Sequence, residues 1–141
     1  LPASFVPGRN ALFLSTAASY AYNRGITQLV GGMCQTDYSG YPDCRRTFIS
    51  SMQTSLSLAM DADLQIHTPL MDLTKAETWK LAADLGTVAG CGVLETVRLM
   101  SHTDYNGDRS QLNEWGYGRL DNPASKLRAK GYEEAKAKGW V

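Results

Sequence analysis

The sequence has little of what marks membrane, nucleic-acid-coating or disulfide-rich proteins. It contains no apolar run near the roughly 20 residues that a membrane-spanning helix needs, and no signal peptide is recognisable. Its 14 basic and 14 acidic side chains balance, which argues against a direct nucleic-acid-binding surface or an acidic tail. The three cysteines are odd in number and irregularly spaced, so reduced thiols in the cytoplasm are expected rather than a disulfide framework.

Several catalytic devices are also missing. The two histidines, His67 and His102, are not clustered, so their spacing supports neither a histidine metal site nor a Ser-His-Asp triad. No glycine-rich phosphate loop is present. The chain begins at Leu1 without an initiating Met, inside a loop-like stretch, which indicates a fragment or a processed piece. A motif that is missing here can therefore lie upstream.

What is present is typical of a packed α/β domain. Hydrophobic residues make up 43% of the chain and charged residues 20%. Helix and strand patterns alternate, which favours a parallel sheet flanked by helices, with ligands beyond the carboxyl ends of the strands. Asn10 is expected to cap the first helix, whereas Thr74 and Glu77 have capping-box spacing at the third. The predicted elements are helices at 11–23, 45–60, 74–86 and 124–138, a buried strand at 27–33, a second strand at 64–68, and an irregular polar segment at 101–122.

Three segments carry candidate chemistry, and the first is FVPGRN, residues 5–10. Its Pro-Gly turn leads to Arg9 and Asn10 at a helix start, where backbone N–H groups and a guanidinium favour an anion. A simple helix cap with a surface arginine explains the same residues equally well.

The second segment is CQTDYSGYPDCR, residues 34–45, directly after the first predicted strand. Tyr38 and Tyr41 offer flat faces for a heterocycle, and Asp37 and Asp43 offer acceptors for its N–H groups. The two cysteines are ten residues apart with no histidine between them, so buried inert thiols are favoured over a zinc site.

The third segment is PLMDLTKAET, residues 69–78. Lys75 lies in the first turn of a predicted helix, where the helix dipole disfavours a cation unless it faces a phosphate or a carboxylate. A solvated lysine on an amphipathic helix is the alternative.

These segments, together with HTDYNG and with WGYG followed by PASKLRAKGYEE, resemble 7-cyano-7-deazaguanine synthases over nearly the whole chain. The resemblance implies a Rossmann-like, nucleotide alpha-hydrolase-like fold, of which this single-domain chain (1–141) is the C-terminal portion with a helical tail. It also implies an ATP-dependent C–N ligase of queuosine biosynthesis. Such an enzyme adenylates 7-carboxy-7-deazaguanine and uses ammonia, with ATP and Mg²⁺, to form the nitrile. A cytoplasmic homodimer is expected.

Carried over residue by residue, the resemblance implies roles for individual side chains. Arg9, Lys75 and Glu77 would be catalytic, and Arg9, Asn10 and Lys75 would bind the nucleotide. The residues that would shape the deazaguanine pocket are Asp37, Tyr38, Ser39, Gly40, Tyr41, Asp43, Cys44 and Arg45.

Two departures from the family pattern are visible. The Ser-Gly-Gly-x-Asp-Ser pyrophosphate loop is not in the chain, so ATP chemistry is not expected from these residues alone. The four zinc-binding cysteines are also replaced, so no zinc is expected, and a looser tail at 101–122 is predicted. A salt bridge between Asp104 and Arg119 could take the place of the metal. The family's zinc positions read Asp104, Arg119, Asn122 and Ser125.

Two other functions stay open from the sequence. One is a diverged relative that adenylates the same acid but passes it to another acceptor, such as an amine on a protein or nucleic acid. The other is a non-catalytic fragment or binding subunit, which the missing ATP loop supports.

Overall fold

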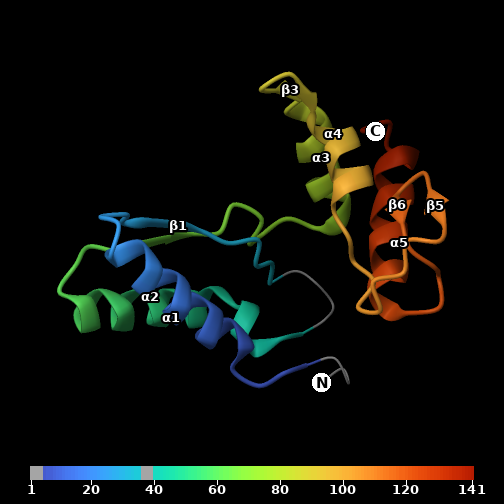
Figure 1. Cartoon of the computed structure of the whole chain (residues 1–141). Coiled ribbons are helices and arrows are strands. Elements are labelled where there is room, and N and C mark those ends of the chain that lie inside the picture. Colours follow the sequence, from blue (N-terminus) through green and yellow to red (C-terminus); the bar gives the residue numbers. More distant parts are fainter. Residues whose placement is uncertain (1–4, 36–39) are drawn as a thin grey trace. The chain divides into compact units, whose positions relative to one another are not determined.

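The computed structural model describes residues 5–35 and 40–141 and has a mixed α/β fold (Figure 1). The described residues form a small parallel sheet and five α-helices, which confirms the predicted combination of helices and parallel strands. The chain divides into two compact units, Leu1–Asp72 and Leu73–Val141, which are described separately below. None of the helices that the structure describes combines the length and the apolar character needed to cross a membrane.

The first unit is built around a two-stranded parallel sheet. Leu29 is paired with Ile66 in this sheet, as expected when a helix connects two neighbouring strands. In Figure 1 the two α-helices of the unit lie on the same side of the strands. The elements are α1 (Arg9–Tyr22), β1 (Gln28–Val30), the 3₁₀ turn η1 (Pro42–Cys44), α2 (Arg46–Met60) and β2 (Gln65–His67).

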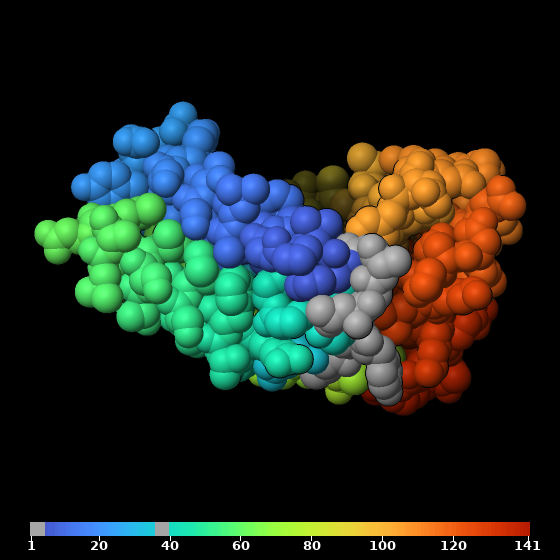
Figure 2. All heavy atoms as spheres, turned by 90° about the horizontal axis from the view of Figure 1, so that it is seen from below, coloured from blue at the N-terminus to red at the C-terminus, as the bar shows by residue number. Residues whose placement is uncertain are grey.

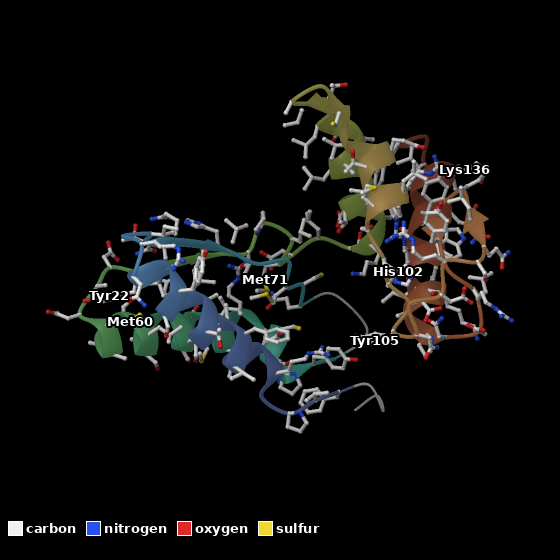
Figure 3. The ribbon with its side chains drawn as sticks, in the orientation of Figure 1. Tyr22, Met60, Met71, His102, Tyr105 and Lys136 are labelled. Atoms are coloured by element: carbon white, nitrogen blue, oxygen red, sulfur yellow. The ribbon has the colours of Figure 1, made fainter. Side chains whose placement is uncertain are left out.

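The core of the first unit lies between the strands and these two helices. Figure 2 shows α1 (blue) and α2 (teal to green) side by side, and the two helices pack against each other. Met71, which is almost fully buried, lies between the strand layer and the helices (Figure 3). The buried residues of this core are Leu14, Ala18, Ile49, Leu56, Leu64, Ile66 and Met71.

Two sequence predictions for this unit are wrong in detail. Asn10 does not cap α1, because the helix begins at Arg9 and its N-cap is Gly8. Gly8 has φ of 73°, a left-handed conformation that glycine adopts without steric cost. The first strand was expected to be buried, but Gln28 and Val30 are exposed and Leu29 alone of the three is half-buried.

The second unit is mainly helical. The predicted helices at 74–86 and 124–138 are confirmed as α3 (Lys75–Asp84) and α5 (Pro123–Ala137). The capping box is confirmed as well, since the Thr74 hydroxyl accepts from the Glu77 N–H and the Glu77 carboxylate accepts from the Thr74 N–H. The sequence patterns did not predict the remaining elements, which are α4 (Val93–Met100), the hairpin β3 (Thr87–Val88) with β4 (Cys91–Gly92), and the hairpin β5 (Leu112–Asn113) with β6 (Gly116–Tyr117).

Helices α3 and α5 approach each other closely at Gly131. A Cβ atom at this position would lie 2.4 Å from Lys75 Cβ and 3.0 Å from the Lys75 carbonyl carbon. The absence of a side chain therefore permits the contact. Next to it, the rings of Trp79 and Tyr132 meet edge to face at 5.1 Å, a favourable aromatic geometry. Trp115 is also buried in this core.

The segment at 101–122 was expected to be irregular and loose. It contains one short regular element, the β5–β6 hairpin, with Asn113 paired to Gly116. The Asn113 side-chain amide also donates to the Gly118 carbonyl at 2.8 Å, which closes the turn. Most of the segment has neither helix nor strand, as predicted, and that it is looser than the rest of the chain stays a prediction.

Candidate functional site

The first and second candidate segments meet in the first unit, although 33 residues separate their contact points in the chain. The Asn10 backbone N–H donates to the Asp43 carboxylate at 3.1 Å, and the Asn10 side-chain amide donates to the Asp43 carbonyl at 3.0 Å. The same amide donates to Cys44 Sγ at 3.3 Å. Asp43 is buried, so these bonds anchor the start of α1 to η1.

The contact between Asn10 and Asp43 changes the interpretation of the helix start. A helix N-terminus attracts an anion because its first N–H groups have no partner within the helix. In this structure the Asp43 carboxylate already accepts from one of those groups. Asn10 is therefore a structural anchor, and a direct contact between Asn10 or Asp43 and a ligand stays a prediction.

A shallow hollow of about 480 Å³ lies where these two segments meet. Phe5, Gly8 and Arg45 are among the residues that line it. The ring of Tyr41, half-buried, lies 5.6 Å from the ring of Phe5. An aromatic wall beside an exposed arginine suits a flat, polar heterocycle with an anionic substituent.

The other pocket residues proposed from the sequence lie around this hollow or outside the described residues. Gly40 is exposed and left-handed, with φ of 64°. Arg9 is half-buried in the first turn of α1 and does not line the hollow. The three pocket residues that lie outside the described residues are Asp37, Tyr38 and Ser39.

A polar network that the sequence did not predict joins the carboxyl ends of the two strands. Asp72 follows β2, and its carboxylate accepts from the Gln35 side-chain amide at 2.8 Å and forms an ion pair with Arg46. The Arg46 backbone N–H donates to the Gln35 side-chain oxygen at 3.2 Å. The position of these residues in the sequence could have indicated the network. Gln35 and Asp72 each follow a predicted strand, and side chains that follow neighbouring parallel strands lie at the same edge of the sheet.

The third candidate segment belongs to the second unit, where Lys75 begins α3. The Glu77 carboxylate accepts from the Thr74 N–H at 2.8 Å and from the Thr74 hydroxyl at 2.9 Å. These hydrogen bonds lower the pKa of Glu77. A carboxylate kept ionised in this way is a poor proton donor, so the contacts favour a structural role for Glu77 over a catalytic one.

The four residues that the resemblance places at the family's zinc positions have contacts and charges of their own. Asp104 is buried and its carboxylate accepts from the Asn106 N–H at 2.8 Å. Asn122 caps α5 by accepting from the Ser125 N–H at 2.8 Å. Arg119 brings a positive charge, and the Ser125 hydroxyl is a weak, neutral donor for Zn²⁺. Among residues 5–35 and 40–141, no three His, Cys, Asp or Glu side chains are grouped to hold a metal ion.

The proposed salt bridge between Asp104 and Arg119 is wrong. The Arg119 guanidinium instead lies 3.3 Å from the Asp121 carboxylate and 3.8 Å from that of Asp108. Arg119 is exposed, whereas Asp104 is buried in a turn, so the two side chains meet different partners.

A buried arginine on α5 makes several hydrogen bonds to α4, to the segment that follows it and to the β5–β6 hairpin. Arg128 on α5 donates through Nε to the Trp115 carbonyl at 2.8 Å and through an Nη atom to the Val97 carbonyl at 2.9 Å. The other Nη atom donates to the hydroxyls of Ser101 and Thr103, at 2.8 and 3.0 Å. Burial lowers the pKa of Arg128. One guanidinium thus ties α4, the segment after it and β5–β6 to α5.

Comparison with known proteins identifies the family of the chain. The model of a family described as "Queuosine biosynthesis protein QueC" matches residues 1–136 of the 141. The chain belongs to the QueC family.

Individual relatives agree with this family. A protein of Nitrobacter hamburgensis named "7-cyano-7-deazaguanine synthase" is 55% identical over 134 residues, which are 95% of this chain and 55% of the relative. A protein of Caulobacter sp. with the same name is 53% identical over 139 residues, 99% of this chain and 54% of the relative. The chain spans about half the length of the curated relatives it matches.

Proposed function

We propose that this chain is the substrate-binding part of a 7-cyano-7-deazaguanine synthase. Membership of the QueC family and about 55% identity to proteins with that name support the proposal. The observation that carries it is the meeting of Asn10 with Asp43 and Cys44, which brings the two most family-specific segments together around one hollow. The fold proposed is the C-terminal portion of a single nucleotide alpha-hydrolase-like domain.

The proposed chemistry has two activation steps. ATP adenylates the carboxylate of 7-carboxy-7-deazaguanine and releases pyrophosphate, and ammonia then displaces AMP to give the amide. A second ATP activates the amide oxygen, which leaves with AMP as the nitrile forms. Two positive groups on this chain, Arg9 and Lys75, would neutralise charge on the phosphates, because fixed cations stabilise charge that develops in such transfers. Mg²⁺ would accompany ATP.

The ligand-binding part of the proposal is tested by calorimetry. The chain, joined to the unmatched part of the Nitrobacter relative, is titrated with 7-carboxy-7-deazaguanine and with ATP. Both ligands are expected to bind, and mass spectrometry of the products should show the nitrile. A conjugate in place of the nitrile would favour a diverged adenylating enzyme, and binding of neither ligand would refute the proposal.

A matched pair of arginine variants locates the binding site. Arg45 lines the hollow, whereas Arg24 is exposed near the end of α1 with its guanidinium over the Tyr20 ring. Arg45→Ala should weaken binding of 7-carboxy-7-deazaguanine about tenfold or more, since a charge-assisted contact to its carboxylate is lost. Arg24→Ala should bind like the parent protein. Equal affinities for all three proteins would move the site elsewhere.

We also propose that the second unit folds without zinc. The support is the donor set at the family's zinc positions together with the hydrogen bonds of Arg128. Purified protein should contain no stoichiometric zinc, and a chelator should leave its thermal unfolding unchanged. One zinc per chain, or a lower melting temperature in the chelator, would contradict this.

A further inference from the structure

Three side chains form a closed ring of polar contacts at the carboxyl ends of β1 and β2. The Gln35 side-chain amide donates to the Asp72 carboxylate at 2.8 Å, and the Gln35 side-chain oxygen accepts from the Arg46 backbone N–H at 3.2 Å. The ion pair between Arg46 and Asp72 closes the ring. The Gln35 backbone N–H also donates to the Met71 carbonyl at 2.9 Å. The ring therefore ties the segment after each strand to the first residue of α2.

The start of α2 receives its cap from a distant residue. Its N-cap is Arg45, whose side chain accepts no hydrogen bond from the helix. The first N–H groups of a helix need acceptors from outside the helix, and Gln35 supplies one from 11 residues earlier in the chain. A carboxylate only accepts hydrogen bonds. Asp72 therefore holds the amide nitrogen of Gln35 toward itself and leaves the amide oxygen for the Arg46 N–H.

The two arginines at this helix start contact different groups. Arg46 pairs with Asp72, whereas Arg45 lines the hollow between the first two candidate segments. Thr47 and Phe48, in the first turn of α2, line the same hollow. None of the three ring residues lines it. Because the helix start moves as one piece, the ring sets the place of one wall of the hollow without touching the space inside it.

We propose that Asp72 is a positioning residue of the substrate site, which acts through Gln35 and Arg46 to hold Arg45 at the hollow. The identity of the substrate rests on the proposed function, in which Arg45 makes a charge-assisted contact to the carboxylate of the deazaguanine. An isolated pair of exposed charges contributes little to a fold. A pair that is joined to a helix cap and to main-chain hydrogen bonds acts as a network, so each member orders the others.

A double-mutant cycle in substrate binding tests the proposal. The chain, joined to the unmatched part of the Nitrobacter relative, is titrated with 7-carboxy-7-deazaguanine. Asp72→Ala should raise the Kd about fivefold, less than Arg45→Ala does, because Arg45 is still present but less well placed. In the Arg45→Ala background, Asp72→Ala should change the Kd less than about twofold, since residues that act through one another are not additive. Equal effects of Asp72→Ala in both backgrounds would overturn the proposal.

Conservative and matched variants separate positioning from general damage. Asp72→Glu keeps a carboxylate acceptor and should retain most of the affinity that Asp72→Ala loses. Asp63→Ala removes another exposed carboxylate of the same unit, which accepts from the Gln65 side chain at 2.6 Å, and it should bind like the parent protein. The affinity for ATP should not change in either Asp72 variant. A loss of ATP affinity as large as the loss of substrate affinity would contradict a positioning role.

Hydrogen exchange without substrate keeps this proposal separate from the proposed function. The Arg46 amide should exchange about tenfold faster in Asp72→Ala than in the parent protein, because Gln35 is no longer held as its acceptor. Asp63→Ala should leave this amide unaffected. An unchanged Arg46 amide in Asp72→Ala would overturn the positioning role even in a protein that binds the substrate. A parent protein that binds no 7-carboxy-7-deazaguanine would refute the proposed function, and the amide then decides whether Asp72 holds the start of α2.

Discussion

The two units of the chain differ in how much apolar surface they leave exposed. The second unit is held by its own contacts, with Arg128 hydrogen-bonded to four groups and Gly131 allowing two helices to touch. The first unit has a core on one side, but α1 and β1 leave a large apolar groove on another. The difference teaches that one unit buries most of its apolar side chains in its own contacts, whereas the other leaves apolar side chains of α1 and β1 exposed.

The largest effect is expected from Arg128→Ala, which should destabilise the second unit. The change removes the donor for two buried carbonyls and two hydroxyls, and we expect a loss of about 3 kcal/mol or more in the free energy of unfolding. All three tryptophans, Trp79, Trp115 and Trp140, belong to this unit, so tryptophan fluorescence in urea reports its unfolding separately.

Two variants control the Arg128 experiment. Lys126→Ala, at an exposed position of α5, should change the stability little. Arg128→Lys keeps the charge but loses the planar fork, and it should rescue only part of the loss. A loss below about 1 kcal/mol for Arg128→Ala would show that other contacts hold the tail.

Gly131→Ala should have the next largest effect. The new Cβ would lie 2.4 Å from Lys75 Cβ, so α3 and α5 must separate, at a cost of roughly 1–3 kcal/mol by the same fluorescence assay. Gly92→Ala, in the same unit, is the control, because a Cβ there would meet only Glu95 Cβ, at 4.0 Å. Unchanged stability of Gly131→Ala would mean that the two helices are less tightly packed than described.

Asp43→Ala tests the hydrogen bonds that join the start of α1 to η1 in the first unit. The loss of the acceptor for the Asn10 N–H should cost roughly 1–2 kcal/mol, as loss of a helix cap does. Hydrogen exchange of the Asn10 amide, followed by NMR, should accelerate about tenfold. Asp63→Ala, at an exposed position, should leave that amide unaffected. If the Asn10 amide exchanged at the same rate in Asp43→Ala and Asp63→Ala, the Asp43 carboxylate would not anchor the start of α1.

The smallest effect concerns the capping box of α3. Thr74→Ala should cost about 1 kcal/mol at neutral pH, whereas Thr78→Ala in the helix interior should not. Hydrogen bonds from the Thr74 N–H and hydroxyl lower the pKa of Glu77 from 4.5. The ionised form therefore stabilises the fold above that value, and this stabilisation is lost as the pH falls through the lowered pKa. The difference between Thr74→Ala and the parent protein should shrink in acid.

Much of the helix pattern was predictable from sequence because its signals are local. Apolar periodicity located α2, and the Thr74–Glu77 spacing located the start of α3. The hairpins and α4 were not predicted, because two-residue strands and an eight-residue helix give too little periodicity to recognise. The three motif segments were found, but the link between Gln35, Arg46 and Asp72 was not, since it depends on how two strands pair.

By itself, the sequence determined the family. Through the resemblance it also predicted which segments line the proposed pocket and that the family's zinc positions read Asp104, Arg119, Asn122 and Ser125. The tertiary structure alone decided what those residues contact. Asn10 binds Asp43 and does not cap its own helix, and Arg119 pairs with Asp108 and Asp121. The physical reason is that caps and ion pairs depend on which distant groups the fold brings within about 3 to 4 Å, and composition and spacing do not encode that distance.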